Sequence, residues 1–418
     1  MVTSKALRFL KPVLVNVAII VVTLLVIDGI CMASGVFPPV MNYGNPELGW
    51  LSGVPTGQMS IGKCTEFSTG ETKIFQRNED GVRTSLSRAA VLADTHRLRI
   101  GVSGDSQTDL CASNDRIPGG VLEAELNAHR HPSTVLTYGA GKYSPLQAYL
   151  AFRKMLVPYR PNVFILQVYT GNDLYDILRA DDRPHFEATD SGYRVADPIW
   201  YSLDNPKVRR KSRVLYVLRT LGDRIGVRQS LLRVAELRRL GRQQGAGMLD
   251  VVSYTRDLLK AREPSVGYPD AFSAQMLNQQ LFFKHFPSAR EESMRRMREL
   301  MTIIRRENPG LMLVMSPIPS YELVGAQPVD AALQRTLTRL PITFEEGQRQ
   351  EGGLYEGLRQ LASEQQWTFV DNLAALRSYK GSGRLYNDFD YHLLPPASAL
   401  VGQAQAEALL RGLPRSSR

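Results

Sequence analysis

A serine stands where a short apolar run of the sequence ends. Residues 98–102 are typical of a strand, and Gly104-Asp105-Ser106 follow them in a glycine-bearing turn. A strand that leads through a tight turn into a helix exposes a serine hydroxyl at the carboxyl edge of a sheet, beside helix amide groups. Gly, Asp and Ser are also common in plain turns, so the tripeptide indicates a nucleophile only together with partners elsewhere in the chain.

Three residues elsewhere in the chain are suitable partners for this serine. They are Gly139, Asn172 and His392. The first two follow runs of β-forming residues, of which 163–169 is typical of a buried parallel strand, and the third precedes a predicted helix over 397–410. In a doubly wound α/β domain the carboxyl ends of the strands open on one edge, so segments distant in sequence converge there.

The serine, glycine, asparagine and histidine blocks stand in the order of the SGNH (GDSL-type) hydrolase superfamily, which the chain resembles. Ser106-Gln107-Thr108 looks like the family's Ser-x-Thr, and residues 144–147 look like its Gly-Pro-Leu-Gln. Thr137 departs from the pattern, because many members have Asn there. The resemblance implies an α/β fold with a flavodoxin-like three-layer α/β/α core around a parallel sheet.

The resemblance also assigns catalytic roles. It makes Ser106 the nucleophile and His392 its base. An oxyanion hole would consist of the backbone N–H groups of Ser106 and Gly139 and the side-chain amide of Asn172. A serine is a weak nucleophile until an imidazole takes its proton, and each oxyanion donor is worth about 3 kcal/mol. The implied intermediate is an acyl-enzyme, which water resolves in a hydrolase and a sugar hydroxyl resolves in a transferase.

The acid of the catalytic triad is where the sequence departs most from the family. Many members have Asp three residues before His, and that position is Phe389 here. Asp390 fits the Asp-x-His spacing of membrane-anchored and polysaccharide-modifying branches, whereas Asp388 would need a local bulge. We predict Asp390 as the acid that holds the imidazole in the right tautomer, with Asp388 as the alternative.

The amino terminus combines a basic head with a long apolar stretch. Lysine and arginine occur within 1–12, and 13–30 is almost uninterruptedly apolar over roughly 18 residues, enough to cross a bilayer. The positive-inside tendency then predicts a single-pass anchor in the inner membrane with a periplasmic catalytic domain. The competing interpretation is a cleaved signal peptide, with small residues at 33–35 as the cut site.

Export also changes how the cysteines are interpreted. Outside the cytosol, Cys64 and Cys111 would form a disulfide that ties the segment before the core to the loop after the nucleophile. The alternative is two unrelated buried thiols. The sequence has no ligand spacing typical of a metal site, so we expect neither a metal nor another cofactor.

The sequence divides into a split α/β core and flanking parts. The predicted parts are a cytoplasmic terminus at 1–12, a transmembrane segment at 13–30, a periplasmic lead-in at 36–95, core parts at 96–178 and 286–414, and an insertion at 179–285. Strands and helices alternate in the core parts, as in a parallel sheet, whereas the insertion is predicted to be mainly helical. In the lead-in, Trp50 either binds a sugar ring or anchors its own segment.

Much of the formal charge of +10 lies in an arginine-rich stretch of the insertion, over 207–242. Such a stretch fits an anionic glycan, an anionic phospholipid surface or a protein in the membrane; it also fits a solvated helix face. Nucleic acid is not expected as a partner, because export is predicted and no nucleic-acid-binding motif accompanies the charge.

Together these features predict a membrane-anchored SGNH-type serine esterase or O-acyltransferase. Its expected substrate is an O-acyl group, acetyl first, on an exported polysaccharide or envelope glycan, and polysaccharide-assembly proteins are expected partners. The glycan follows from the resemblance and the predicted location, since no residue identifies a sugar. The alternatives are a lipid or small-ester esterase and, in another class, a catalytically silent scaffold of exopolysaccharide assembly.

Overall fold

The computed structural model describes the core of the chain and parts of its flanking segments. The described residues are 16, 19, 22–23, 26, 43–45, 47–53, 55–66, 70–180, 183–190, 192–198, 248–261, 279–325, 334, 337–387 and 391–413. Among them, no helix has the length and apolarity that crossing a bilayer requires, about 20 apolar residues. This finding contradicts the predicted transmembrane helix and inner-membrane location, and most of 13–30 itself lies outside the described residues.

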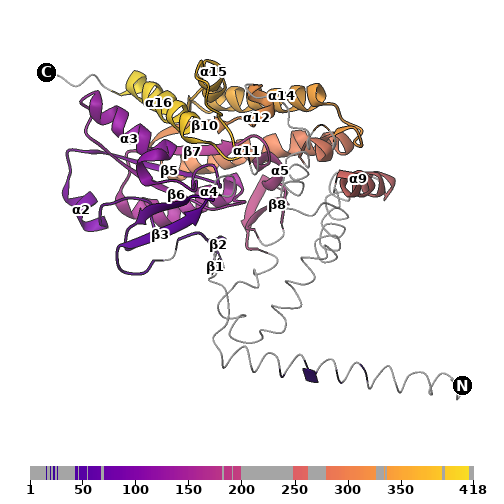
Figure 1. The fold of residues 1–418 in the computed structure, drawn as a ribbon, viewed down its shortest axis with the longest axis horizontal. Helices are drawn as coiled ribbons and strands as arrows, with labels where there is room; N and C mark the ends of the chain where they lie inside the picture. The colour runs from indigo at the N-terminus through magenta and orange to yellow at the C-terminus, as the bar shows by residue number, and fades with distance from the viewer. Residues whose placement is uncertain are drawn as a thin grey trace, which may run out of the picture.

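A five-stranded parallel sheet forms the centre of the fold (Figure 1). Its strands are β5 (Leu98–Gly104), β6 (Ser133–Gly139), β7 (Val163–Tyr169), β10 (Met312–Ile318) and β11 (Thr368–Phe369). Their spatial order is β6-β5-β7-β10-β11, and all neighbouring strands are parallel. In this doubly wound order, as in flavodoxin, the direction of winding reverses between β5 and β7, and all carboxyl ends share one edge.

Helices cover both faces of the sheet and make the fold a three-layer α/β/α structure. On one face lie α3 (Pro118–Ala128) and α16 (Pro395–Gly412); on the other lie α4 (Pro145–Ala151), α5 (Asp173–Asp176), α11 (Pro287–Glu307) and α14 (Phe344–Glu364). Val163 and Ile165 of β7 pack with the first layer, whereas Phe164 and Leu166 pack with the second. Because both faces are covered, every residue of β7 is buried, which explains its continuous apolar run.

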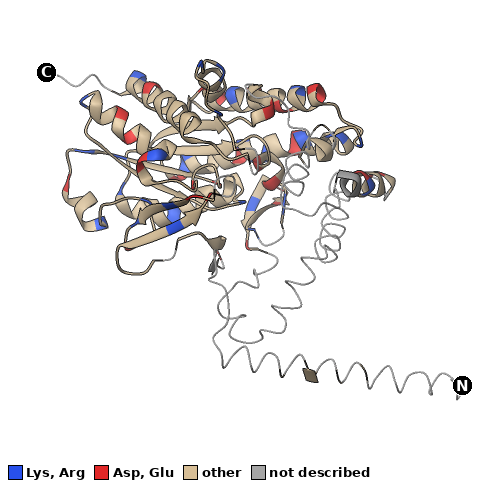
Figure 2. Cartoon of the chain, viewed as in Figure 1, with Lys and Arg blue, Asp and Glu red and all other residues tan. Residues whose placement is uncertain are grey.

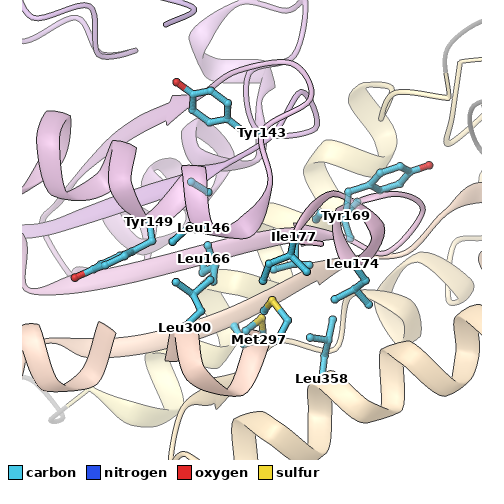
Figure 3. Close-up of a cluster of buried hydrophobic side chains, with 14 of the residues drawn as sticks. Tyr143, Leu146, Tyr149, Leu166, Tyr169, Leu174, Ile177, Met297, Leu300 and Leu358 are labelled. Atoms are coloured by element: carbon cyan, nitrogen blue, oxygen red, sulfur yellow. The ribbon is translucent and has the colours of Figure 1, made fainter. Parts of the chain in front are cut away.

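The core of the second layer extends to the loop after β7. Figure 3 shows Leu166 of β7 near Met297 and Leu300 of α11, with Leu358 of α14 and Leu174 of α5 in the same cluster. All five side chains are fully buried. Burial of each such side chain contributes about 2 kcal/mol, so α5 and the loop before it are fixed to the sheet by apolar packing.

Two of the predicted strands and the final helix are confirmed with small changes at their ends. The strand expected over 163–169 has those bounds, and the strand expected over 98–102 continues to Gly104. The final helix, expected over 397–410, begins earlier because Pro395 occupies its first turn, where the missing N–H costs nothing.

Short helices and hairpins flank the sheet. They are the helices α2 (Arg88–Ala93), α9 (Met248–Ala261), α12 (Tyr321–Val324) and α15 (Asn372–Arg377), and the hairpins β1 (Tyr43–Asn45) with β2 (Gly49–Leu51), β3 (Ser60–Thr65) with β4 (Thr72–Arg77) and β8 (His185–Thr189) with β9 (Gly192–Ala196). The described part of the insertion therefore contains a β-hairpin besides helix. Its arginine-rich stretch, 207–242, lies outside the described residues. In the described part of the chain, basic and acidic residues are interspersed (Figure 2).

The described lead-in is packed against the core. Leu48 is fully buried, and Trp50 is only 5% exposed. The indole N–H of Trp50 donates to the carbonyl oxygen of Gly141 at 3.1 Å, and its ring centre lies 5.6 Å from that of Tyr143. The interpretation of Trp50 as a sugar-binding ring is wrong because the ring is buried; Trp50 anchors its segment to the loop after β6.

Candidate active site

In the turn after β5, Ser106 and Asp109 are partly exposed, whereas Asp105, Gln107 and Thr108 are buried. The backbone carbonyl of Asp105 accepts hydrogen bonds from the N–H groups of Thr108 and Asp109, both at 3.2 Å. The carboxylate of Asp105 also accepts the N–H of Gln107 at 2.9 Å. These bonds close the turn tightly, and Ser106 stays partly exposed in it, as a nucleophile requires.

Gly139 ends β6 directly opposite Gly104, the last residue of β5. A Cβ atom on Gly139 would lie 2.7 Å from the carbonyl oxygen of Asp105 and 3.0 Å from that of Gly104. Only glycine permits such an approach, so the register of the sheet brings this backbone against the turn of Ser106. The hydroxyl of Ser52 donates to the Gly139 carbonyl and holds it from the other side.

Asn172 lies between β7 and α5. The carboxylate of Asp173 accepts the N–H of Tyr169 at 2.8 Å and thereby closes the turn that contains Asn172. The side-chain amide of Asn172 donates from Nδ2 to Oδ2 of Asp176 at 2.7 Å. The same NH₂ group carries a second hydrogen, which is free to donate a hydrogen bond to an oxyanion.

Gln107 joins the histidine loop to the serine turn. Its Nε2 donates to the carbonyl oxygen of Tyr391 at 3.1 Å, and its Oε1 accepts the N–H of Leu393 at 3.0 Å. The two bonds span 284 and 286 residues of sequence and lie on either side of His392. Because Gln107 directly follows Ser106, this clamp holds the backbone on either side of the predicted base against the turn of the predicted nucleophile. In the sequence, Gln107 is only the variable residue of a Ser-x-Thr pattern.

The backbone of the histidine loop has an unusual conformation. Tyr391 has a φ of 55°, in the left-handed region that aromatic residues rarely adopt. Its ring stacks on that of Tyr321 with centres 4.6 Å apart, and the carbonyl of His392 accepts the N–H of Asn387 at 2.9 Å. Such conformations persist only where surrounding contacts enforce them, and they concentrate at functional sites.

Both candidates for the triad acid, Asp390 and Asp388, lie outside the described residues, so the choice between them stays a prediction.

Three buried carboxylates interact beside the serine and asparagine turns. Burial raises the pKa of Asp105 to about 6, although the N–H of Gln107 and the charge on His392 oppose the rise. Burial, together with the negative charges of Asp105 and Asp176, raises the pKa of Asp173 well above its usual range. Among the described residues, no three His, Cys, Asp or Glu side chains are arranged to share a metal ion.

The raised pKa of Asp105 makes the stability of the fold depend on pH. Its ordinary pKa is 3.8, so the folded protein binds this proton more tightly than the unfolded chain does. The resulting stabilisation is fully present below that ordinary pKa and is lost as the pH rises through about 6. The side chain of Asp105→Asn is uncharged at every pH. The free energy of unfolding of this variant, relative to that of the wild type, is expected to rise by up to about 3 kcal/mol between about pH 4 and pH 7.

Urea unfolding of both proteins at the two pH values measures this gain. The matched control is Asp115→Asn, because the Asp115 side chain is 75% exposed and lies in the loop that follows the same turn. A difference in the free energy of unfolding between Asp105→Asn and wild type that stays constant with pH would contradict the prediction.

A disulfide joins Cys64 and Cys111, whose Cα atoms are 5.7 Å apart. Of the two interpretations left open by the sequence, the structure therefore has the bridge rather than two unrelated thiols. Cys64 lies in β3, and Cys111 lies 47 residues later, in the loop after the nucleophile turn. Closing a loop of this length is worth about 4 kcal/mol in the chain-entropy account.

Gln107, Asp176 and Arg183 are site residues that sequence reasoning missed. Gln107 clamps the histidine loop, Asp176 accepts the amide of Asn172, and Arg183 contacts Asp176 at 3.5 Å. The spacing of Asn172 and Asp176 by one helical turn was the signal available in the sequence for the second of these.

Comparisons with known proteins complete the description of the chain. No family model matches the sequence, and no curated protein matches it significantly. Solved structures to which it is similar include the lipase/acylhydrolase from Enterococcus faecalis, with 10% identity, coverage of 77% of this chain and 100% of that chain, and a TM-score of 0.36. An acetylxylan esterase from Geobacillus stearothermophilus has 10% identity, coverage of 77% and 97%, and a TM-score of 0.32. TM-scores of this size do not establish a common fold, so the functional assignment rests on the geometry around Ser106.

Proposed function

We propose that the chain is a serine ester hydrolase or O-acyltransferase of the SGNH type. The observation that carries the proposal is the meeting of the serine, glycine, asparagine and histidine blocks at the carboxyl edge of the sheet. Ser106 and Asn172 follow the two strands between which the winding reverses, where doubly wound sheets bind ligands. The β5–β6 register brings Gly139 to the same point, and the Gln107 clamp brings His392.

In the proposed mechanism, His392 takes the proton of Ser106 as the serine oxygen attacks the carbonyl carbon of the ester. The carbonyl oxygen becomes an oxyanion, which accepts hydrogen bonds from the N–H groups of Ser106 and Gly139 and from the amide of Asn172. The intermediate collapses as the alcohol leaves with the proton from His392, and the acyl group remains on Ser106. Water or an acceptor hydroxyl then attacks the acyl carbon and gives its proton to His392, which returns it to the oxygen of Ser106 as the acid or the new ester leaves.

The proposed substrate carries a neutral acyl group, and the acetyl esters of a polysaccharide are our first choice. Asp105 is buried beside the serine turn, and its pKa, which burial raises to about 6, leaves it negatively charged above that pH. This charge disfavours an anionic acyl group such as succinyl and is indifferent to acetyl. Hydrolysis and transfer share one acyl-enzyme and differ in the acceptor that reaches it.

The test is turnover and trapping with the full chain. We expect hydrolysis of p-nitrophenyl acetate in preference to the mono-succinyl ester, and covalent labelling of Ser106 by a fluorophosphonate, located by mass spectrometry. The control is Ser113→Ala, since Ser113 lies in the same loop with its hydroxyl bonded to Asp115. Labelling must survive in Ser113→Ala and disappear in Ser106→Ala.

Two further outcomes define the reaction. With an acetylated polysaccharide, free acetate identifies a hydrolase, whereas acetyl groups appearing on an added deacetylated acceptor identify a transferase. A wild-type protein that neither turns over an ester nor takes the label at Ser106 would overturn the proposal in favour of the silent scaffold.

A further inference from the structure

A buried arginine lies between the two loops that contribute the proposed oxyanion donors. Arg183 is 2% exposed, and its Nε and Nη2 both donate to the carbonyl oxygen of Lys142 at 3.2 Å. The same Nη2 lies 3.5 Å from Oδ1 of Asp176. Lys142 belongs to the loop that begins after Gly139, and Asp176 bonds the side chain of Asn172. One guanidinium group thus bridges the glycine loop and the asparagine turn.

Asp176 determines which end of the Asn172 amide faces it. An ionised carboxylate only accepts hydrogen bonds, so the NH₂ group must point toward Asp176 and the carbonyl end must point away. Because Nδ2 of Asn172 lies 2.7 Å from Oδ2 of Asp176, one NH₂ hydrogen points at this oxygen and the direction of the other is fixed as well. The second oxygen of Asp176 contacts Arg179 at 3.2 Å and Arg183 at 3.5 Å, so the carboxylate is itself held in place.

The glycine loop, which consists of residues 140–142 after Gly139, is held by Arg183 and Trp50. Lys142 has a φ of 66°, a conformation that needs outside support, and its carbonyl receives both bonds from Arg183. The guanidinium carbon of Arg183 lies 5.5 Å from the ring centre of Trp50, whose indole N–H donates to Gly141. Gly139 is therefore followed by a loop that is fastened at two successive positions.

We propose that Asp176 and Arg183 are positioning residues for the oxyanion hole: together they fix the Asn172 amide and the Gly139 loop relative to each other. The inference rests on the proposed function, because it concerns stabilisation of an oxyanion that forms in that reaction. Hydrogen-bond donors that are already in position before the reaction stabilise the transition state without reorganisation. We therefore expect Asp176 and Arg183 to affect kcat more than KM.

The experiment compares Asp176→Asn, Arg183→Met and the control Arg194→Met in the full chain. Arg194 lies in β9, pairs with Glu187 of β8 at 2.6 Å and has a side chain that is 71% exposed, so it tests whether the loss of any arginine charge from this part of the chain suffices. We expect Asp176→Asn and Arg183→Met each to lower kcat on p-nitrophenyl acetate by roughly tenfold or more with KM little changed, and Arg194→Met to change kcat less than about twofold. Asp176→Asn keeps the shape of the side chain, so it remains informative if Arg183→Met does not fold.

A double-mutant cycle separates positioning from a general structural effect. If Asp176 acts through Asn172, Asp176→Asn introduced into Asn172→Ala should lower kcat by less than about twofold. An equal loss in both backgrounds would overturn the inference while Ser106-dependent turnover of the wild type leaves the proposed function standing. A wild type without Ser106-dependent turnover would overturn both.

Discussion

Alanine in place of Ser106 is expected to lower kcat for an ester on the order of 10⁶-fold. The rate that remains is the one that substrate binding and the oxyanion hole support without a nucleophile. The serine oxygen is the atom that forms the acyl bond in the proposed mechanism, and the described turn has no second hydroxyl with comparable exposure, since Thr108 is buried. The measurement is steady-state turnover of p-nitrophenyl acetate, with circular dichroism and thermal unfolding to show that the variant is folded.

His392→Ala should cause a loss of similar size, because without its base the serine keeps its proton. The two residues act as one unit, so the double variant Ser106→Ala/His392→Ala should be no slower than either single variant. If the fold-losses in kcat of the two single variants multiplied in the double variant, Ser106 and His392 would act independently. A Ser106→Ala variant that retains a tenth of the wild-type rate would show that another group is the nucleophile.

Asn172→Ala is expected to lower kcat by about 10²- to 10³-fold with a smaller change in KM. The amide meets its proposed partner only when the carbonyl oxygen gains charge, so its contribution appears in the transition state rather than in substrate binding. Asn172→Asp should be slower still, because it would place a carboxylate both against Asp176 and toward the oxyanion. The measurement is the separate determination of kcat and KM on p-nitrophenyl acetate.

The control for this prediction is Asn127→Ala. The Asn127 side chain accepts the N–H of Ser133 at 2.9 Å, at the amino end of β6, so it supports the sheet at the edge opposite the site. Both variants lose a buried or partly buried amide contact, but only Asn172→Ala should affect kcat strongly. Equal losses in the two variants would indicate a general effect of stability, and a changed KM with constant kcat would remove Asn172 from the oxyanion hole.

The local elements of the core and the sheet edge that carries the candidate site were predictable from sequence because both are recorded in short segments. A strand buried on both faces needs a continuous apolar run, and 163–169 is such a run. Gly139 ends β6, and Ser106 and Asn172 lie in the turns after β5 and β7, so a parallel sheet brings the three to one edge without further information. The inner-membrane location predicted from the apolar composition of 13–30 is contradicted, because no helix among the described residues could cross a bilayer.

Only the tertiary structure decided how the site is held together. The clamp from Gln107 to the histidine loop joins residues 284 and 286 positions apart, and the bridge of Arg183 joins two loops that follow different strands. The pairing of Cys64 with Cys111 is of the same kind. A strand, a turn or a helix cap depends on neighbouring residues and leaves a local pattern. A buried glutamine or arginine that bonds distant backbone has the same local sequence as an exposed one, and its role follows only from which loops the fold brings together.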